Sequence, residues 1–155
     1  MLRILAAFIF FTRLPFWRLA EVPSEYFKNV VSRWALVGWL TAGLSVIVLY
    51  TASLILPASV AVLLAIVTRL LITGCLHEDG LADFFDGFGG GTSRERILSI
   101  MKDSHIGSYG VIGLILYFSL LYTLLSSLPP ALAGSARLAG DPFSKGVAGM
   151  IINRL

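Results

Sequence analysis

The feature that most constrains the fold of this chain is an uncharged run of 23 residues, Trp34–Leu56. A helix of that length reaches across a hydrocarbon core about 30 Å thick. Because backbone N–H and C=O groups find no water to bond in lipid, such a run must satisfy them internally, and a helix does so. The run therefore predicts a transmembrane helix.

Composition supports a membrane protein and excludes other classes. The 155 residues are 57% hydrophobic and only 14% charged, whereas soluble domains carry about 25% charged residues. The high apolar content excludes intrinsic disorder, and the single Cys75 excludes a disulfide scaffold. The length fits one domain, so we expect a single membrane-embedded domain over residues 1–155.

Two further apolar runs complete the predicted membrane part. Ala58–Leu76 is interrupted only by Arg69, and Ile106–Leu128 carries no charge. With the first run they predict an all-α, polytopic helical bundle with transmembrane helices over residues 34–56, 58–76 and 106–128. The first two form a hairpin, and a polar segment over residues 77–105 precedes the third.

Arg69 lies well inside the second predicted helix. A cation at that depth is costly unless it has a partner or water. We favour a structural counter-ion within the bundle over the alternative, a catalytic group.

Both ends of the chain contain shorter apolar segments. Leu2–Leu14 is too short to cross a bilayer and predicts a half-inserted or re-entrant helix. After Pro130 we expect a break at Gly140–Pro142 and then a short helix from Phe143. The sequence stops within that last pattern, which indicates an incomplete chain.

The distribution of Lys and Arg predicts the orientation. Five of them precede Trp34, the turn at Pro57-Ala58 has none, and three lie between Arg94 and Lys102. Because positive flanks stay in the cytoplasm, the segment over residues 77–105 is expected on the cytoplasmic side of the inner membrane.

That segment concentrates acidic residues, since six of the nine acids of the chain lie between Glu78 and Asp103. On a helix, Asp79, Asp83 and Asp86 fall within an arc of roughly 60°. Three carboxylates on one face repel one another, and a hard divalent cation relieves the repulsion by taking oxygen ligands from them. The pattern predicts a Mg²⁺ site, and a solvated helix end is the alternative.

Several residues lie next to this acidic stripe in the sequence. On the same wheel Glu78 and His77 lie roughly 100° and 160° away. Gly80 and Gly87 beside the stripe admit a ligand or let helices pack closely. Gly89-Gly-Gly is expected to end the helix in a flexible loop.

A second helix is predicted to follow. Thr92 as N-cap with Glu95 at position N3 forms a capping box, and the helix continues to about Asp103 as an interfacial amphipathic helix. At its end Asp103 adds a carboxylate, and Lys102 or His105 is suited to hold a phosphate. Lys102 as a snorkelling residue is the alternative.

Aspartates that hold Mg²⁺ suit a diphosphate substrate, because the metal neutralises the phosphate oxygens and orients the leaving group. Two membrane reactions need this: transfer of a phospho-alcohol from a nucleoside diphosphate ester, and transfer of a prenyl group from its diphosphate. We expect small-molecule substrates and the lipid bilayer as partners, with no nucleic acid, and leave a homo-oligomer open.

Two long motifs make a family recognisable. His77-x-Asp-Gly-Leu-Ala-Asp-x-x-Asp-Gly is followed by Met101-Lys-Asp-Ser-x-x-Gly-Ser-Tyr-Gly, and Phe11-Thr-Arg-Leu-Pro precedes both. The chain closely resembles the cobalamin synthases, or adenosylcobinamide-GDP ribazoletransferases. The resemblance implies an inner-membrane enzyme that uses Mg²⁺ to join adenosylcobinamide-GDP to α-ribazole, or its 5′-phosphate, with release of GMP.

The resemblance also implies roles for individual residues. Asp79, Asp83 and Asp86 would hold Mg²⁺ against the diphosphate, with Asp83 as the preferred base and His77 completing the catalytic set. Substrate contacts are expected at Lys102, Asp103, Ser104, Gly107 and Gly110.

Two departures accompany the resemblance. CDP-alcohol phosphotransferases are the second choice, because Asp83 stands where their motif has Arg. Members of the first family also continue past residue 155 with further transmembrane helices.

Overall fold

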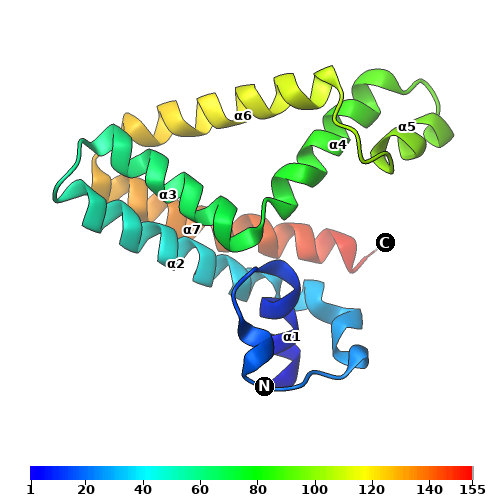
Figure 1. Ribbon diagram of the computed structural model, residues 1–155, viewed down its shortest axis with the longest axis horizontal. Coiled ribbons are helices and arrows are strands. Elements are labelled where there is room, and N and C mark those ends of the chain that lie inside the picture. Colours follow the sequence, from blue (N-terminus) through cyan, green and yellow to red (C-terminus); the bar gives the residue numbers. More distant parts are fainter. Residues whose placement is uncertain (155) are drawn as a thin grey trace. The chain divides into compact units, whose positions relative to one another are not determined.

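The computed structural model describes residues 1–154, and the regular elements among these residues are all helices, as predicted (Figure 1). The elements are α1 Leu2–Phe11, η1 Phe16–Arg18, η2 Ser24–Arg33, α2 Trp34–Ser53, α3 Ala58–Thr73, α4 Leu76–Gly90, α5 Arg94–Met101, α6 Ser108–Ser126 and α7 Pro130–Ile152, where η marks a 3₁₀ helix.

The residues group into two compact units, which are described one at a time. Unit 1 contains Met1–Gly74 and Leu125–Leu155, and unit 2 contains Cys75–Leu124. The single domain expected from the sequence stays a prediction.

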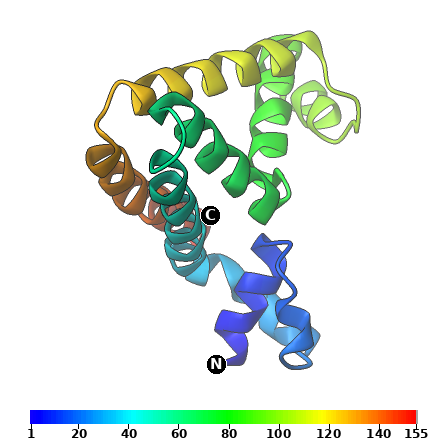
Figure 2. The ribbon, with the colours of Figure 1, turned by 60° about the vertical axis from the view of Figure 1, so that its left-hand side comes forward.

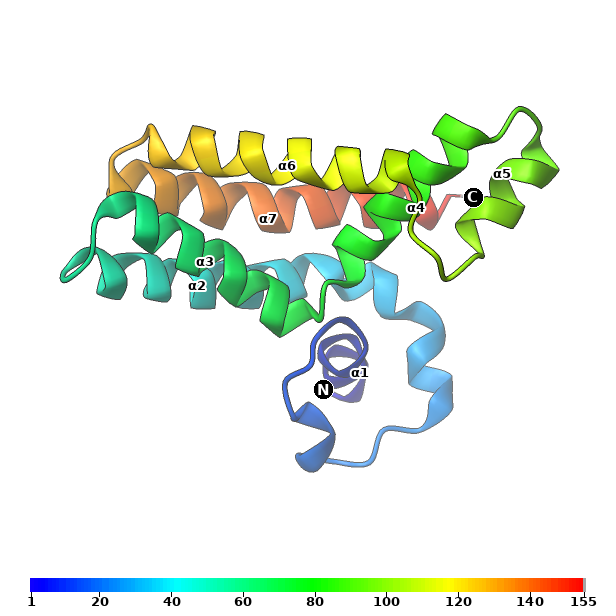
Figure 3. The ribbon, with the colours of Figure 1, turned by 45° about the horizontal axis from the view of Figure 1, so that its top comes forward.

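In unit 1, α2 is the central helix and packs against both α3 and α7. Figure 3 shows α2 and α3 as antiparallel neighbours, which is the predicted hairpin. Small side chains make the close packing with α7 feasible. A Cβ added to Gly38 would lie 2.7 Å from the Cα of Pro142, so only glycine fits there.

The N-terminal part of unit 1 has its own apolar core. α1 packs against η2, and Ala6, Ala7 and Phe11 are buried on the inner side of α1. The ring of Phe11 stacks on Trp34 with their centroids 5.0 Å apart, which ties α1 to the start of α2. The predicted helix is confirmed as α1, and its depth in the membrane stays a prediction.

In unit 2, α4 and α5 fold against each other (Figure 2). A Cβ on Gly87 would lie 2.7 Å from the Met101 side chain, so this glycine serves helix packing. The prediction that Gly89-Gly-Gly ends the helix is confirmed. α4 ends at Gly90, and Gly91 is the first extended residue.

Two helices are long and apolar enough to cross a membrane, by length and composition alone: η2 joined to α2, over Ser24–Ser53, and α6. α3 has 16 residues and passes the same test only in combination with α4, which gives a third candidate span. The chain is therefore a membrane protein with two or three candidate spans among the described residues.

The C-terminal expectation was wrong. Instead of a break at Gly140–Pro142 and a short helix, α7 runs unbroken for 23 residues and contains Pro142. Proline removes one backbone hydrogen bond, but neighbouring helices in membrane bundles often compensate for it. Here Pro142 is buried against Gly38 of α2, and this packing holds the helix together.

Candidate functional site

α4 carries the acidic stripe on a regular helix, as predicted. The spacing of Asp79, Asp83 and Asp86 therefore places all three on one face. Partial burial and, after it, the negative charges of Asp79 and Asp86 raise the pKa of Asp83. The central carboxylate thus sits in a field of like charge, which a bound cation would relieve.

Asp86 is held differently from the other two. It is buried, and its two carboxylate oxygens accept backbone N–H bonds from Gly107 (2.7 Å) and Gly110 (2.8 Å). These donors lie at the start of α6, where free N–H groups and the helix dipole favour an anion. These two hydrogen bonds therefore connect Asp86 of α4 to the start of α6.

Gly107 and Gly110 are glycines for a steric reason. A Cβ on either residue would lie 2.4 Å from a carboxylate oxygen of Asp86. Their N–H groups are directed at this side chain, and the substrate contacts expected of both glycines stay predictions.

Asp79 is exposed and Asp83 is half-buried, so their oxygens are accessible. Within residues 1–154, no three His, Cys, Asp or Glu side chains converge closely enough to enclose a metal. Mg²⁺ rarely needs such an enclosure, because it typically binds one or two carboxylates together with substrate phosphates and water. Asp79 and Asp83 supply that kind of donor set, so the residues fit Mg²⁺ bound with a phosphate ligand.

His77 lies within α4, because the helix already begins at Leu76. Its side chain therefore leaves the helix roughly 160° from the acidic stripe. The structure does not bring His77 onto the same face as the aspartates, and its catalytic role stays a prediction.

Asp103 and His105 form a pair with each other in the loop after α5. The Asp103 carboxylate accepts the backbone N–H of His105 (3.1 Å) and lies 2.6 Å from its Nδ1. These hydrogen bonds lower the pKa of Asp103 and raise that of His105. Lys102 and Ser104 are exposed beside them, and the roles expected of these residues stay untested predictions.

The cap of α5 differs by one residue from the prediction. Ser93, not Thr92, is the N-cap, and its hydroxyl accepts the backbone N–H of Arg96 (3.2 Å). Glu95 is therefore at N2 and takes no part in a capping box, so that structural reading of Glu95 was wrong. Adjacent Thr and Ser both suit an N-cap, and the pattern alone did not separate them.

Sequence reasoning missed a polar cluster inside unit 1. The Asp141 carboxylate accepts the hydroxyl of Thr41 on α2 (2.5 Å) and the ammonium of Lys145 on α7 (2.5 Å). Thr41 is completely buried and Lys145 is 4% exposed. The signal was present as the four-residue spacing of Arg137, Asp141 and Lys145, which places them on one face of a helix.

Arg69 of α3 belongs to the same cluster. It is buried and interacts electrostatically with both Asp141 and Lys145. These interactions support the expected counter-ion role of Arg69, with Asp141 as an anionic partner.

These features define a helical membrane protein with three aspartates on one face of a helix, two of them accessible. Comparison with known sequences gives the particular family. The profile described as Cobalamin-5-phosphate synthase matches residues 3–155, and the chain belongs to that family.

Individual relatives agree with the profile. A Shewanella sp. (strain W3-18-1) protein and a Shewanella putrefaciens (strain CN-32) protein, both named adenosylcobinamide-GDP ribazoletransferase, are 47% identical to the chain over 151 residues. The match covers 96% of this chain and 58% of each relative. A Shewanella oneidensis protein of the same name is 44% identical over 146 residues, with 92% of this chain and 56% of the relative covered.

The chain therefore spans a little over half the length of these relatives. No solved structure matches it.

Proposed function

We propose that the protein containing this chain is an adenosylcobinamide-GDP ribazoletransferase. It transfers the cobinamide-phosphate group of adenosylcobinamide-GDP to α-ribazole, or α-ribazole 5′-phosphate, and releases GMP. The names of the Shewanella relatives support the reaction. The observation that carries the proposal is the pair of accessible carboxylates on α4, Asp79 and Asp83, beside a third that is fixed in place.

The proposed site divides its tasks among the three aspartates. Asp79 and Asp83 hold Mg²⁺ against the diphosphate, and Asp86 joins them as the third proposed ligand. The cation neutralises charge on the phosphate oxygens. Since Asp86 already accepts two N–H bonds, it contributes chiefly by fixing the direction of α4 relative to the start of α6.

Asp83 is the proposed general base. Its carboxylate is accessible, and a deprotonated carboxylate beside the attacking hydroxyl is what general-base catalysis requires. It would take the proton of the ribazole hydroxyl as that oxygen attacks the phosphorus joined to cobinamide. The bond from phosphorus to the GMP oxygen breaks, and GMP leaves.

His77 completes the proposed catalytic set. The proposed substrate contacts are Lys102, Asp103, Ser104, Gly107 and Gly110. Asp103 and Lys102 both lie at the end of α5, in the same unit as α4.

The proposed setting is the cytoplasmic side of the inner membrane. Five basic residues precede α2, and this charge bias favours the cytoplasm for the N-terminal flank. We also propose that the protein can form a homo-oligomer. A CDP-alcohol phosphotransferase is not retained as a second function, because the family match and the relatives favour the cobalamin reaction.

The test uses the full-length protein in detergent or proteoliposomes with adenosylcobinamide-GDP, α-ribazole and Mg²⁺. GMP and the cobalamin product should form in equal amounts, and formation should stop when EDTA removes the metal. Absence of GMP, with turnover of a CDP-linked alcohol instead, would contradict the proposal. GMP formation that persists in EDTA would contradict the metal's part in it.

A further inference from the structure

Two cavities of opposite character share a wall at the N-terminal end of unit 1. The larger, about 410 Å³, is lined by Met1, Leu2, Arg3, Ile4, Tyr26 and Arg33. The smaller, about 280 Å³, is lined by Met1, Ile4, Leu5, Phe8, Phe16, Leu19 and Ala20. Met1 and Ile4 border both, so the two cavities are adjacent.

The larger cavity, which we call the basic cavity, is suited to a phosphate. Arg3 comes from α1 and Arg33 from the end of η2, so two cationic residues border one space together with Tyr26. Guanidinium forks bind phosphate through paired N–H donors. The described residues that line this cavity include no acid to compete for those donors.

The smaller cavity, which we call the apolar cavity, is suited to a hydrocarbon chain. All seven lining residues are apolar. The rings of Phe8 and Phe16 stack with their centroids 5.1 Å apart and give the cavity a rigid wall. Leu19, on its rim, is 71% exposed, so the apolar surface is open to the surroundings rather than closed within the core.

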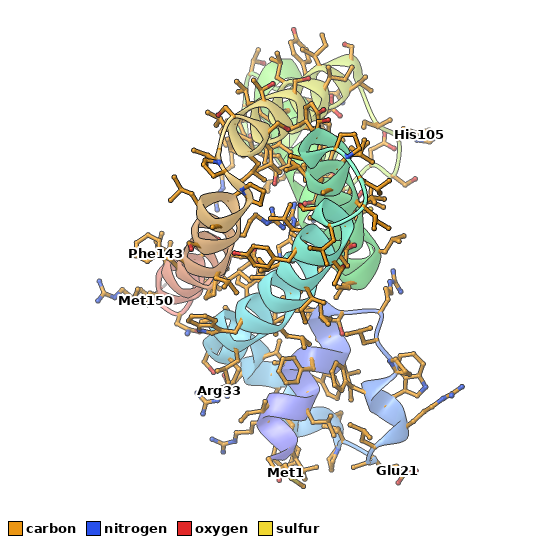
Figure 4. All side chains as sticks on the ribbon, turned by 90° about the vertical axis from the view of Figure 1, so that its left-hand side faces the viewer. Met1, Glu21, Arg33, His105, Phe143 and Met150 are labelled. Atoms are coloured by element: carbon orange, nitrogen blue, oxygen red, sulfur yellow. The ribbon has the colours of Figure 1, made fainter. Side chains whose placement is uncertain are left out.

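A ligand that fills both cavities must join an anionic head to an apolar tail. We propose that this part of unit 1 is a binding site for one anionic phospholipid, with the phosphate in the basic cavity and an acyl chain in the apolar cavity. Two observations favour a lipid over a soluble anion: the adjoining apolar cavity, and the membrane location of the protein, where lipids are abundant. Figure 4 labels Met1 and Arg33, which mark the shared wall and the basic cavity.

The site does not depend on the proposed function. Every residue that lines the two cavities belongs to unit 1, whereas the acidic stripe belongs to unit 2. Failure of one proposal therefore leaves the other standing.

The experiment measures retention of phosphatidylglycerol by the full-length protein in native mass spectrometry, with phosphatidylethanolamine as competitor. We expect wild type to retain phosphatidylglycerol selectively and the double variant Arg3→Gln with Arg33→Gln to bind it at least tenfold more weakly. The matched control is Arg18→Gln with Lys28→Gln, which removes the same charge from residues that line neither cavity. We expect the control to change binding less than twofold.

Equal losses in the two double variants would overturn the proposal, because they would show general attraction of lipid to a basic segment. Equal retention of both lipids by wild type would overturn it as well. Displacement of the lipid by millimolar glycerol 3-phosphate would assign the basic cavity to a soluble phosphate instead. Should the glutamine variant fail to fold, Arg3→Lys with Arg33→Lys keeps the charge without the fork, and we expect intermediate affinity.

Discussion

The carboxylates in the acidic stripe of α4 and in the polar cluster of unit 1 have opposite electrostatic surroundings. Asp141 in the cluster is enclosed by partners, since both of its oxygens are bonded and Lys145 supplies the opposite charge. Asp83 in the stripe is flanked by charges of its own sign. A buried ion pair whose hydrogen bonds are satisfied has a structural role. Carboxylates that repel one another on an accessible face are typical of a functional site.

Asp86 shows that the contrast is set by surroundings rather than by the motif. It belongs to the same run of aspartates as Asp83, yet it is buried and bonded to two backbone N–H groups. The comparison therefore separates Asp83 from both Asp86 and Asp141, and substitutions at the three positions should have different consequences.

The largest effect is expected for Asp83→Asn. Loss of the proposed base should reduce turnover of the full-length protein roughly 10²- to 10⁴-fold. Without metal the free energy of unfolding should stay the same or rise, since one of three repelling charges is removed. Steady-state GMP release and thermal unfolding in EDTA measure the two quantities. Normal turnover would remove Asp83 from the proposed mechanism, and a large loss of stability would show that Asp83, like Asp86, has a structural role.

The next effect concerns stability in unit 1. Lys145→Met removes the ammonium bonded to Asp141 while Arg69 remains as a cation of the cluster, so the free energy of unfolding should fall toward the lower end of about 3–5 kcal/mol. The double variant Asp141→Asn with Lys145→Met also removes the counter-ion of the buried Arg69 and should be no more stable than the single variant. Thermal unfolding in detergent measures both variants. A double variant as stable as wild type would show that Arg69 does not depend on Asp141.

Asp86→Asn should produce a smaller loss of stability. Asparagine presents one oxygen and one amide nitrogen, so it cannot accept both N–H groups, and we expect a loss of about 1.5–3 kcal/mol. Asp79→Asn, at an exposed position of the same helix, should change stability by less than about 0.5 kcal/mol. Equal losses of stability in the two variants would show that the hydrogen bonds of Asp86 do not distinguish it from Asp79.

The smallest effect tests the corrected cap of α5. Ser93→Ala should lower stability by about 1 kcal/mol, because the N–H of Arg96 loses its acceptor. Thr92→Ala should have no measurable effect. Hydrogen exchange of the first turn of α5 reports both, and the reverse ranking would restore Thr92 as the cap.

Much of the fold could be predicted because it depends on long, periodic signals. The uncharged run from Trp34 predicts α2. The i, i+4, i+7 spacing of Asp79, Asp83 and Asp86 predicts a helix that carries all three on one face. The break expected at Pro142 failed for a tertiary reason: its packing against Gly38 overrides the local preference of proline.

The candidate site was less accessible to sequence reasoning. The partners of Asp86 are backbone N–H groups 21 and 24 residues further along the chain, and no side-chain pattern reports them. Thr41 and Asp141 are 100 residues apart, so their contact arises only once α2 and α7 pack together. Motifs identified the residues, and the structure separated the positioning residue Asp86 from the accessible pair.

Binding of Mn²⁺, a spectroscopic substitute for Mg²⁺ at carboxylates, tests the central claim most directly. Electron paramagnetic resonance of the full-length protein with bound adenosylcobinamide-GDP measures it. We predict that wild type binds the ion and that Asp79→Asn with Asp83→Asn weakens binding at least tenfold while the protein stays folded. Equal Mn²⁺ affinity in wild type and the double variant would contradict the account.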